Sequence, residues 1–155
     1  MTKLNIINKD ILTVEKGIIV QQVNAIGATG AGLSGAINAK YPIVKEHYLY
    51  EHKIGYLTLG RVLYVKVAQD VFVASIVGQQ NVGTYKVQTD FVALEKGLRE
   101  VSILSKRDEL PVFIPYFLGS GLGGGPTQQT KQETWAKVSE LIMSILPEAI
   151  ICKLS

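Results

Sequence analysis

The sequence has a single cysteine, Cys152, and no long apolar run. One cysteine excludes an internal disulfide and fits a reducing compartment. The N-terminal residues MTKLNIINKDIL are too polar for a signal peptide, and no apolar stretch approaches the ~20 residues that span a bilayer. These features predict a cytoplasmic protein with no membrane partner.

Metal ligands and concentrated charge are also scarce. The two histidines, His47 and His52, lie near Glu46 and Glu51, and the cysteine is far away in the sequence. This set does not form a metal-binding motif, so we expect neither a metal nor another cofactor. The net charge is +3 and the lysines and arginines are scattered, so composition does not require a nucleic-acid partner, although it does not exclude one.

What the chain does have is enough apolar sequence for one folded domain. It is 155 residues long, with 47% hydrophobic and 19% charged residues, which is a globular composition. Strand-like apolar runs alternate with helical periodicities, so we predict an α/β fold in which helices cover both faces of a sheet. We see no internal repeat and treat residues 1–155 as a single domain.

Apolar patterns set the expected positions of these elements. Two of the strand-like runs are joined by a short polar turn typical of a hairpin, and Pro42 separates the first two helices because the residue before proline disfavours the helical region. Strands are predicted at residues 4–7, 17–25, 61–67, 71–77, 112–118 and 149–154, and helices at 35–40, 43–53, 85–104 and 135–146.

The segment QVNAIGATGAGLSGA, residues 22–36, joins a strand-like run to a helical one through a glycine-rich turn. Glycines permit tight backbone turns, and the small side chains leave room for a ligand against the main chain. Backbone N–H groups in such a turn, and in the first turn of a helix, carry partial positive charge, so phosphate is a suitable ligand. On this segment alone, an anion site and a simple strand-to-helix connection are equally good interpretations.

A second glycine-rich turn lies in the segment FIPYFLGSGLGGG, residues 113–125. It again follows an apolar run and precedes a helical segment. If the two strands are neighbours in one sheet, both turns leave the same edge and can enclose a diphosphate from both sides. Two such turns favour ligand binding over a purely structural connection.

In their order and spacing, these motifs resemble the macro domain family, which binds ADP-ribose, and the resemblance covers nearly the whole chain. It implies a three-layer α/β/α fold with a mixed central sheet. The segments that carry it are Asp10-Ile11, Val23-Asn24-Ala25, Gly30-Ala31-Gly32-Leu33, Ile114-Pro115, Gly119-Ser120-Gly121-Leu122-Gly123-Gly124 and Trp135-Ala136-Lys137-Val138.

The resemblance also implies roles for particular residues. The Asp10 carboxylate is expected to accept a hydrogen bond from the adenine amino group, with Ile11 beside it. Asn24 is expected near the distal ribose and is the candidate catalytic residue, while the diphosphate is expected between the two glycine-rich turns. The implied ADP-ribose-binding residues are Asp10, Ile11, Asn24, Gly30, Ala31, Gly32, Leu33, Ser34, Gly119, Ser120, Gly121, Leu122, Gly123 and Gly124.

Within the family, the chain looks most like two hydrolytic branches, but it departs from both. One branch removes ADP-ribose from glutamate or DNA bases, and the other removes phosphate from ADP-ribose 1''-phosphate. The first places a lysine where this chain has Gly78-Gln79-Gln80-Asn81, and some of its members have an aspartate at the position of Gly123. The second has a histidine at the position of Gln21. The polar stretch at 126–134 is an addition, expected either to cap the ligand or to be flexible.

Two functions therefore follow as alternatives. The first is hydrolysis of ADP-ribose 1''-phosphate or of an ADP-ribosyl adduct on protein or DNA, with Asn24 orienting a water and loop amides stabilising developing charge. The second is a non-catalytic reader of ADP-ribose, which the missing lysine, histidine and aspartate favour. A nucleotide-binding module for another ligand is a third alternative. The sequence does not decide which bond is cleaved or which macromolecule carries the ADP-ribose.

Overall fold

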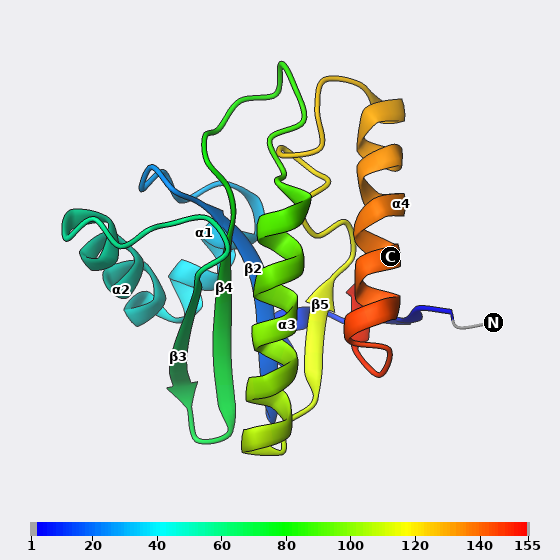
Figure 1. The fold of residues 1–155 in the computed structure, drawn as a ribbon. Helices are drawn as coiled ribbons and strands as arrows, with labels where there is room; N and C mark the ends of the chain where they lie inside the picture. Colours follow the sequence, from blue (N-terminus) through cyan, green and yellow to red (C-terminus); the bar gives the residue numbers. More distant parts are fainter. Residues whose placement is uncertain (1–2, 155) are drawn as a thin grey trace.

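A computed structural model describes residues 3–154, in which a sheet lies between two pairs of helices (Figure 1). The strands are β1 (Asn5–Asn8), β2 (Gly17–Asn24), β3 (Val62–Ala68), β4 (Val71–Gln79), β5 (Val112–Pro115) and β6 (Ile150–Lys153). The helices are α1 (Gly32–Lys40), α2 (Pro42–Lys53), α3 (Phe91–Asp108) and α4 (Gln128–Ile145), and a 3-10 turn, η1, spans Ile11–Thr13.

The six strands form one sheet in the order β1-β6-β5-β2-β4-β3. The pairs are parallel except for the antiparallel hairpin of β3 and β4, so the expected mixed sheet is confirmed. β2 lies between β5 and β4, and all three run in the same direction. Their carboxyl ends therefore meet at one edge, and the connections that follow them gather there (Figure 1).

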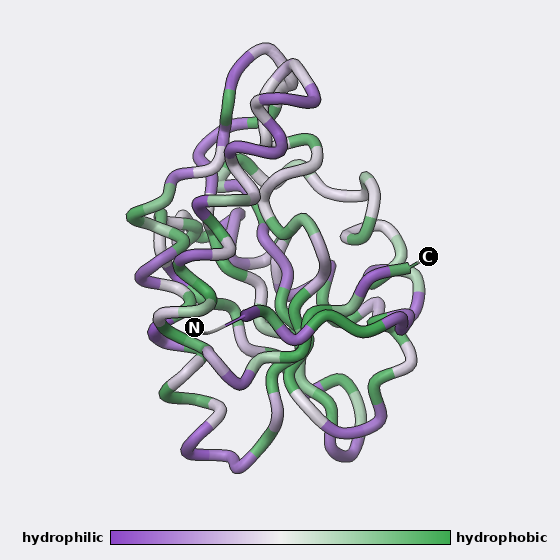
Figure 2. Tube along the Cα trace, turned by 90° about the vertical axis from the view of Figure 1, so that its right-hand side faces the viewer, coloured by the Kyte–Doolittle hydropathy of each residue, from purple (hydrophilic) through white to green (hydrophobic). Residues whose placement is uncertain are grey.

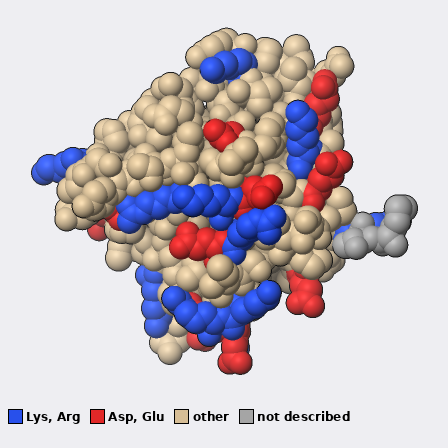
Figure 3. All heavy atoms as spheres, in the orientation of Figure 1, with Lys and Arg blue, Asp and Glu red and all other residues tan. Residues whose placement is uncertain are grey.

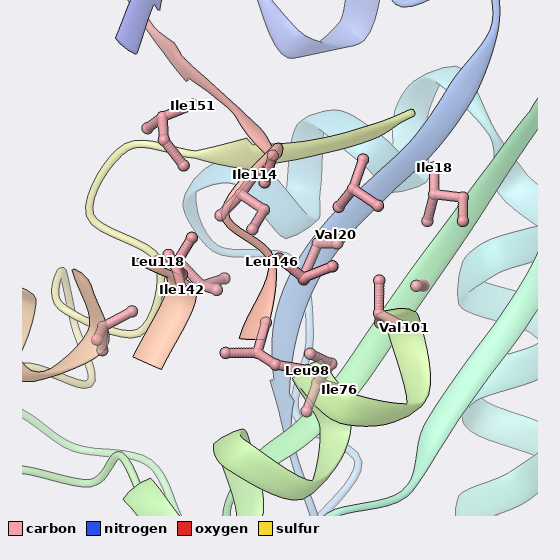
Figure 4. Close-up of a cluster of buried hydrophobic side chains, with 14 of the residues drawn as sticks. Ile18, Val20, Ile76, Leu98, Val101, Ile114, Leu118, Ile142, Leu146 and Ile151 are labelled. Carbon is pink, nitrogen blue, oxygen red and sulfur yellow. The ribbon is translucent and has the colours of Figure 1, made fainter. Parts of the chain in front are cut away.

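Apolar side chains fill both faces of the sheet. On β2, Ile18 and Val20 belong to the cluster beneath α3 and α4, together with Leu98 (Figure 4). The alternate residue Ile19 belongs to a second cluster, in which Ile37 of α1 is also buried. Because successive strand residues point to opposite faces, this continuous apolar run can supply both layers. Figure 2 shows the hydrophobic colour concentrated along the strands and the hydrophilic colour toward the outside.

Several helices begin at positions other than those predicted. The helix expected from residue 85 begins at Phe91, because the Asp90 carboxylate accepts a hydrogen bond from Ala93 N (3.0 Å) and caps it. The helix expected from Trp135 begins at Gln128, where Thr127 and Thr130 form a reciprocal capping box. The polar stretch at 126–134 is therefore mostly the start of α4, and the prediction that it forms an added loop was wrong.

Helix α1 starts earlier than the sequence pattern predicts. The helix begins at Gly32 and not at residue 35, so part of the predicted first glycine-rich turn is helical. Its first turn consequently lies within the segment expected to bind an anion. Within the described residues 3–154, no helix is long and apolar enough to cross a bilayer.

Candidate functional site

A cavity of about 650 Å³ opens at the carboxyl ends of β2, β4 and β5. This volume is within the ~300–1,000 Å³ typical of small-molecule sites. Three connections line it: residues 28–34 after β2, residues 82–84 after β4, and residues 116–119 with 121–123 after β5. The sheet order explains this convergence, since the three strands are neighbours and parallel.

Asn24 holds the first connection in shape. Its Oδ1 accepts hydrogen bonds from Ile26 N (3.2 Å) and Ala28 N (3.1 Å), and its Nδ2 donates to Ala28 O (2.6 Å). Asn24 is buried yet lines the cavity. One N–H of its amide is therefore committed to the loop, and the second has no acceptor among the described residues.

The N-terminus of α1 opens on the cavity without a side-chain cap. Its N-cap residue, Ala31, makes no capping hydrogen bond, whereas α3 and α4 are capped by Asp90 and Thr127. Gly32, Leu33 and Ser34 line the cavity. Uncapped N–H groups at a helix start carry partial positive charge and favour an anion.

Space above the first connection is also open. A Cβ atom built on Gly30 or Gly32 would meet no other atom within 4 Å, and both residues have positive φ angles, 114° and 54°. A Cβ on Gly35, by contrast, would lie 2.6 Å from Gly30 O. Gly35 is thus required for packing of the turn, whereas Gly30 and Gly32 leave room for a ligand.

The glycines of the second connection also differ in their surroundings: one is tightly packed and another borders open space. A Cβ on Gly124 would lie 2.2 Å from Ser120 O, but a Cβ on Gly121 would meet nothing within 4 Å. Among the described residues, no acceptor is present for the backbone N–H groups of Gly121, Leu122 and Gly123. This turn therefore has unpaired backbone donors in residues that line the cavity.

Two adjacent glutamines at the end of β2 link the loops to the sheet. The Gln21 amide donates to Ser75 Oγ (2.9 Å) and accepts from Ser34 Oγ (2.8 Å), which anchors α1. On the opposite face of the strand, Gln22 Nε2 donates to Gln79 Oε1 (2.9 Å) and to Thr89 Oγ1 (2.9 Å). Sequence reasoning treated Gln21 only as a departure from a histidine and gave Gln22 no role.

No Asp, Glu, His, Lys or Arg side chain of the described residues lines the cavity. Its polar side chains are amides, hydroxyls and the Tyr116 phenol. In the segments 25–31, 79–90 and 116–127, the charged residues are Lys86 and Asp90, and Asp90 caps α3. On the face seen in Figure 3, charged side chains spread across the middle, the lower part and the right-hand side, and few lie at the very top. An anion at this site would be held by backbone amides and helix dipole, not by lysine or arginine.

Solved structures identify the fold. A Bacteroides thetaiotaomicron protein of unknown function is 26% identical, with a TM-score of 0.83 over 99% of both chains. A macrodomain protein from Streptomyces coelicolor is 24% identical, with a TM-score of 0.78 over 99% of both chains. Thermosipho africanus DarTG, solved in complex with ADP-ribose, is 19% identical, with a TM-score of 0.74 over 97% of this chain and 41% of that one. The chain has the macrodomain fold. No protein-family model matches it, and no curated protein matches it in sequence.

In this macrodomain fold, most of the predicted binding residues do line one cavity. They come from β2 and from the two glycine-rich connections, as the sequence led us to expect. The residues that line it are Asn24, Gly30, Ala31, Gly32, Leu33, Ser34, Gly119, Gly121, Leu122 and Gly123.

Four predicted residues lie outside the lining. Ser120 is fully buried, and its hydroxyl donates a hydrogen bond to Leu118 O (3.1 Å). It therefore stabilises the turn and does not line the cavity. Gly124 is also buried and packed against Ser120. The Asp10 carboxylate is exposed and accepts a hydrogen bond from Leu12 N (2.9 Å), which caps η1, and Ile11 is buried in the cluster beneath α1.

The macrodomain cavity is also lined by residues to which the sequence gave no binding role. They include the third connection after β4 and the aromatic residues after β5. Phe117 has a positive φ of 66° and its ring stacks on Tyr116, with ring centroids 4.9 Å apart. The lining residues that were not among the predicted binding residues are Gln21, Gln22, Val23, Ala28, Thr29, Gln79, Val82, Gly83, Thr84, Pro115, Tyr116, Phe117 and Leu118.

The histidines lie on α2, away from the cavity lining. His47 Nε2 is 3.5 Å from Glu51 Oε1, and Arg61 Nη2 is 2.7 Å from the same oxygen. Glu51 is buried, so Arg61 compensates a carboxylate that would otherwise be costly in the interior. Within residues 3–154, no group of three or more potential ligands gathers around a point where a metal could bind.

Proposed function

We propose that the cavity binds ADP-ribose, free or attached to a protein or DNA carrier. One observation carries this proposal: unpaired backbone N–H groups from two separate loops border a single uncharged cavity. Those of α1 begin at Gly32, and those of the second connection begin at Gly121. A diphosphate between them would be neutralised by amide dipoles on both sides. Thermosipho DarTG, solved in complex with ADP-ribose, supports this assignment, because 41% of its chain matches this fold.

The positions of Asn24, Ile11 and Asp10 suggest where the distal ribose and the adenine of ADP-ribose would lie. Asn24, at the cavity wall, would lie near the distal ribose. Asp10 and Ile11 lie beyond the lining, but Ile11 belongs to the same apolar cluster as Leu33, a lining residue. The adenine would therefore extend past Leu33 toward η1, with an oxygen of the Asp10 carboxylate accepting from its amino group.

The uncharged lining favours binding without turnover. General acid–base catalysis uses a side chain that can exchange a proton near neutral pH, and the polar side chains at this cavity are amides, hydroxyls and one phenol. Hydrolysis is the second candidate, because Asn24 retains one amide N–H that can orient a water against the ribose or its 1''-phosphate. It would then depend on positioning and on loop amides.

Isothermal titration with ADP-ribose tests the proposal, and product analysis separates the two candidates. ADP-ribose 1''-phosphate, ADP-ribosylated protein and ADP-ribosylated DNA are incubated with the protein in turn. Tight binding without product supports a reader, whereas released phosphate or free ADP-ribose supports hydrolysis of the corresponding substrate. A chain that binds none of these ligands would overturn the proposal.

A further inference from the structure

We propose that Thr89 is a positioning residue for the second glycine-rich connection, and this inference rests on the proposed function of the cavity. Thr89 is only 6% exposed and does not line the cavity, so it cannot contact a ligand there. It lies just before α3, in a segment the sequence pattern had assigned to the helix. The structure places this segment, in extended form, against the back of the connection after β5.

Thr89 holds both ends of that connection. Its hydroxyl donates to Gly119 O (2.5 Å), and its backbone N–H donates to Gly123 O (3.3 Å), which also accepts from Gln88 N (2.9 Å). Isolated β-bridges join Gln79 to Thr89 and Val87 to Gly124. The segment before α3 is thus paired with β4 on one side and with the second connection on the other.

The Thr89 hydroxyl is itself oriented by the sheet. Its oxygen accepts from Gln22 Nε2 (2.9 Å), which leaves its own hydrogen for Gly119 O. Gln22 Nε2 also donates to Gln79 Oε1 (2.9 Å), and Gln79 Nε2 donates to Asn81 O (2.8 Å). One hydrogen-bonded chain therefore connects β2, β4 and the second connection, in a partly buried place where such bonds are strengthened.

This arrangement controls which backbone groups meet the ligand. The carbonyl oxygens of Gly119 and Gly123 accept hydrogen bonds from Gln88 and Thr89, which do not line the cavity. These partly negative oxygens are therefore held away from a bound anion. The N–H groups of Gly121, Leu122 and Gly123 stay unpaired. There is also little room for the connection to move, because a Cβ on Gly123 would lie 2.9 Å from Gln79 Oε1 and 3.1 Å from Thr89 Oγ1.

The test compares Thr89→Val, which keeps the shape but removes the hydroxyl, with Thr89→Ser, which keeps the hydroxyl. Thr58→Val, in the connection between α2 and β3, is the matched control. Affinity for ADP-ribose should fall about tenfold in Thr89→Val and stay close to the wild-type value in the other two variants. Thr89→Ala replaces Thr89→Val if the valine variant does not fold.

A spectroscopic readout separates positioning from general destabilisation. Backbone amide spectra without ligand should show displaced signals for residues 119–123 in Thr89→Val, while those of residues 32–34 stay in place. On addition of ADP-ribose, residues 32–34 should still respond and residues 121–123 should respond less than in the wild type. Unchanged signals at 119–123 together with wild-type affinity would overturn the role of Thr89. If the wild-type protein does not bind ADP-ribose, the proposed function fails, and the ligand-free spectra alone decide whether Thr89 positions the connection.

Discussion

The hydroxyl of Tyr48 lies 2.7 Å from the main-chain oxygen of Asn24 and 2.8 Å from its side-chain Oδ1. Tyr48 belongs to α2 and is buried, and Asn24 is the last residue of β2. This contact connects the helical layer to the point where the first connection leaves the sheet. Burial raises the pKa of Tyr48 to about 12, with a smaller opposing effect from the backbone at Gly27. The proton that it donates to Asn24 is therefore retained well above neutral pH.

Removing that hydroxyl should loosen the first connection. Tyr48→Phe keeps the ring in the core and is expected to lower the free energy of unfolding by about 1 kcal/mol, because Asn24 keeps its other hydrogen bonds. ADP-ribose affinity should fall as well. Urea denaturation and calorimetric titration measure the two effects, and a Tyr50→Phe variant, altered on the exposed side of the same helix, should resemble the wild type in both.

The same tyrosine should make stability sensitive to alkaline pH. Its pKa is higher in the folded protein, about 12, than its ordinary value of 10. The stabilisation is thus complete below pH 10 and is lost as the pH rises through 12, because the unfolded chain ionises first. Between pH 9 and pH 11.5 the wild-type protein should lose about 2 kcal/mol more stability than Tyr48→Phe. Parallel loss in both proteins would contradict the assignment.

A side chain at Gly121 should block the cavity without disturbing the fold. Its φ is not in the positive region and a Cβ there meets open space, whereas Gly32 has a φ of 54° and would be strained by any substitution. In Gly121→Leu we expect ADP-ribose affinity at least about tenfold weaker and unfolding free energy within about 0.5 kcal/mol of the wild type. Gln69→Leu, in the turn between β3 and β4, is the control. Wild-type binding by Gly121→Leu would place the diphosphate elsewhere.

Asp10 has two predicted roles that substitutions can separate. Asp10→Asn keeps an oxygen to accept from Leu12 N, whereas Asp10→Ala removes the cap and should cost about 1 kcal/mol of stability. Both variants should weaken ADP-ribose binding several-fold. In Asp10→Asn an amide N–H would face the adenine amino group, and in Asp10→Ala no side-chain acceptor remains for it. Binding of ribose 5-phosphate, which lacks adenine, should not change. Unaltered ADP-ribose affinity in Asp10→Ala would refute the adenine assignment.

The affinity for ADP-ribose should be nearly independent of pH between 6 and 9. Among the described residues, no Asp, Glu, His, Lys, Arg or Cys side chain lines the cavity. The diphosphate of the ligand stays ionised throughout this range. We expect dissociation constants measured calorimetrically across this range to agree within about threefold. A tenfold change centred near pH 6.5 would instead implicate a histidine.

Much of the fold could be predicted because strong local signals agree with it. The β-branched runs at 17–24 and 71–77 lie within β2 and β4, and the amphipathic spacing of residues 91–104 lies within α3. Helix starts were less predictable. Asp90 and Thr127 are good N-cap residues, but the apolar periodicity suggested earlier and later starts, and the hydrogen bonds that decide a boundary involve only one or two side chains.

The glycines identified two walls of the cavity in advance, but the third wall was not recognised. Residues 82–84 line it beside Gln79, and apart from Gly83 they carry no turn signature that suggests a ligand. The Gln22, Gln79 and Thr89 network was also not foreseen, since each residue alone is an ordinary polar side chain. Their roles depend on hydrogen bonds between residues that are distant in the chain. Gln22 and Gln79 are 57 positions apart, and Gln22 and Thr89 are 67 positions apart.

The sequence by itself determined the local chemistry of this protein: which runs are apolar enough for buried strands, where the backbone can turn tightly, and which segments are free of charge. Tertiary structure decided which strands are neighbours. Backbone hydrogen bonds between strands are the same for any sequence, so pairing depends on how side chains pack across the whole sheet. Placing β2 between β5 and β4 brings Gly32, Gly121 and Thr84 around one cavity and sets Thr89 behind Gly119. No local pattern contains that arrangement, because it exists only after the chain has folded.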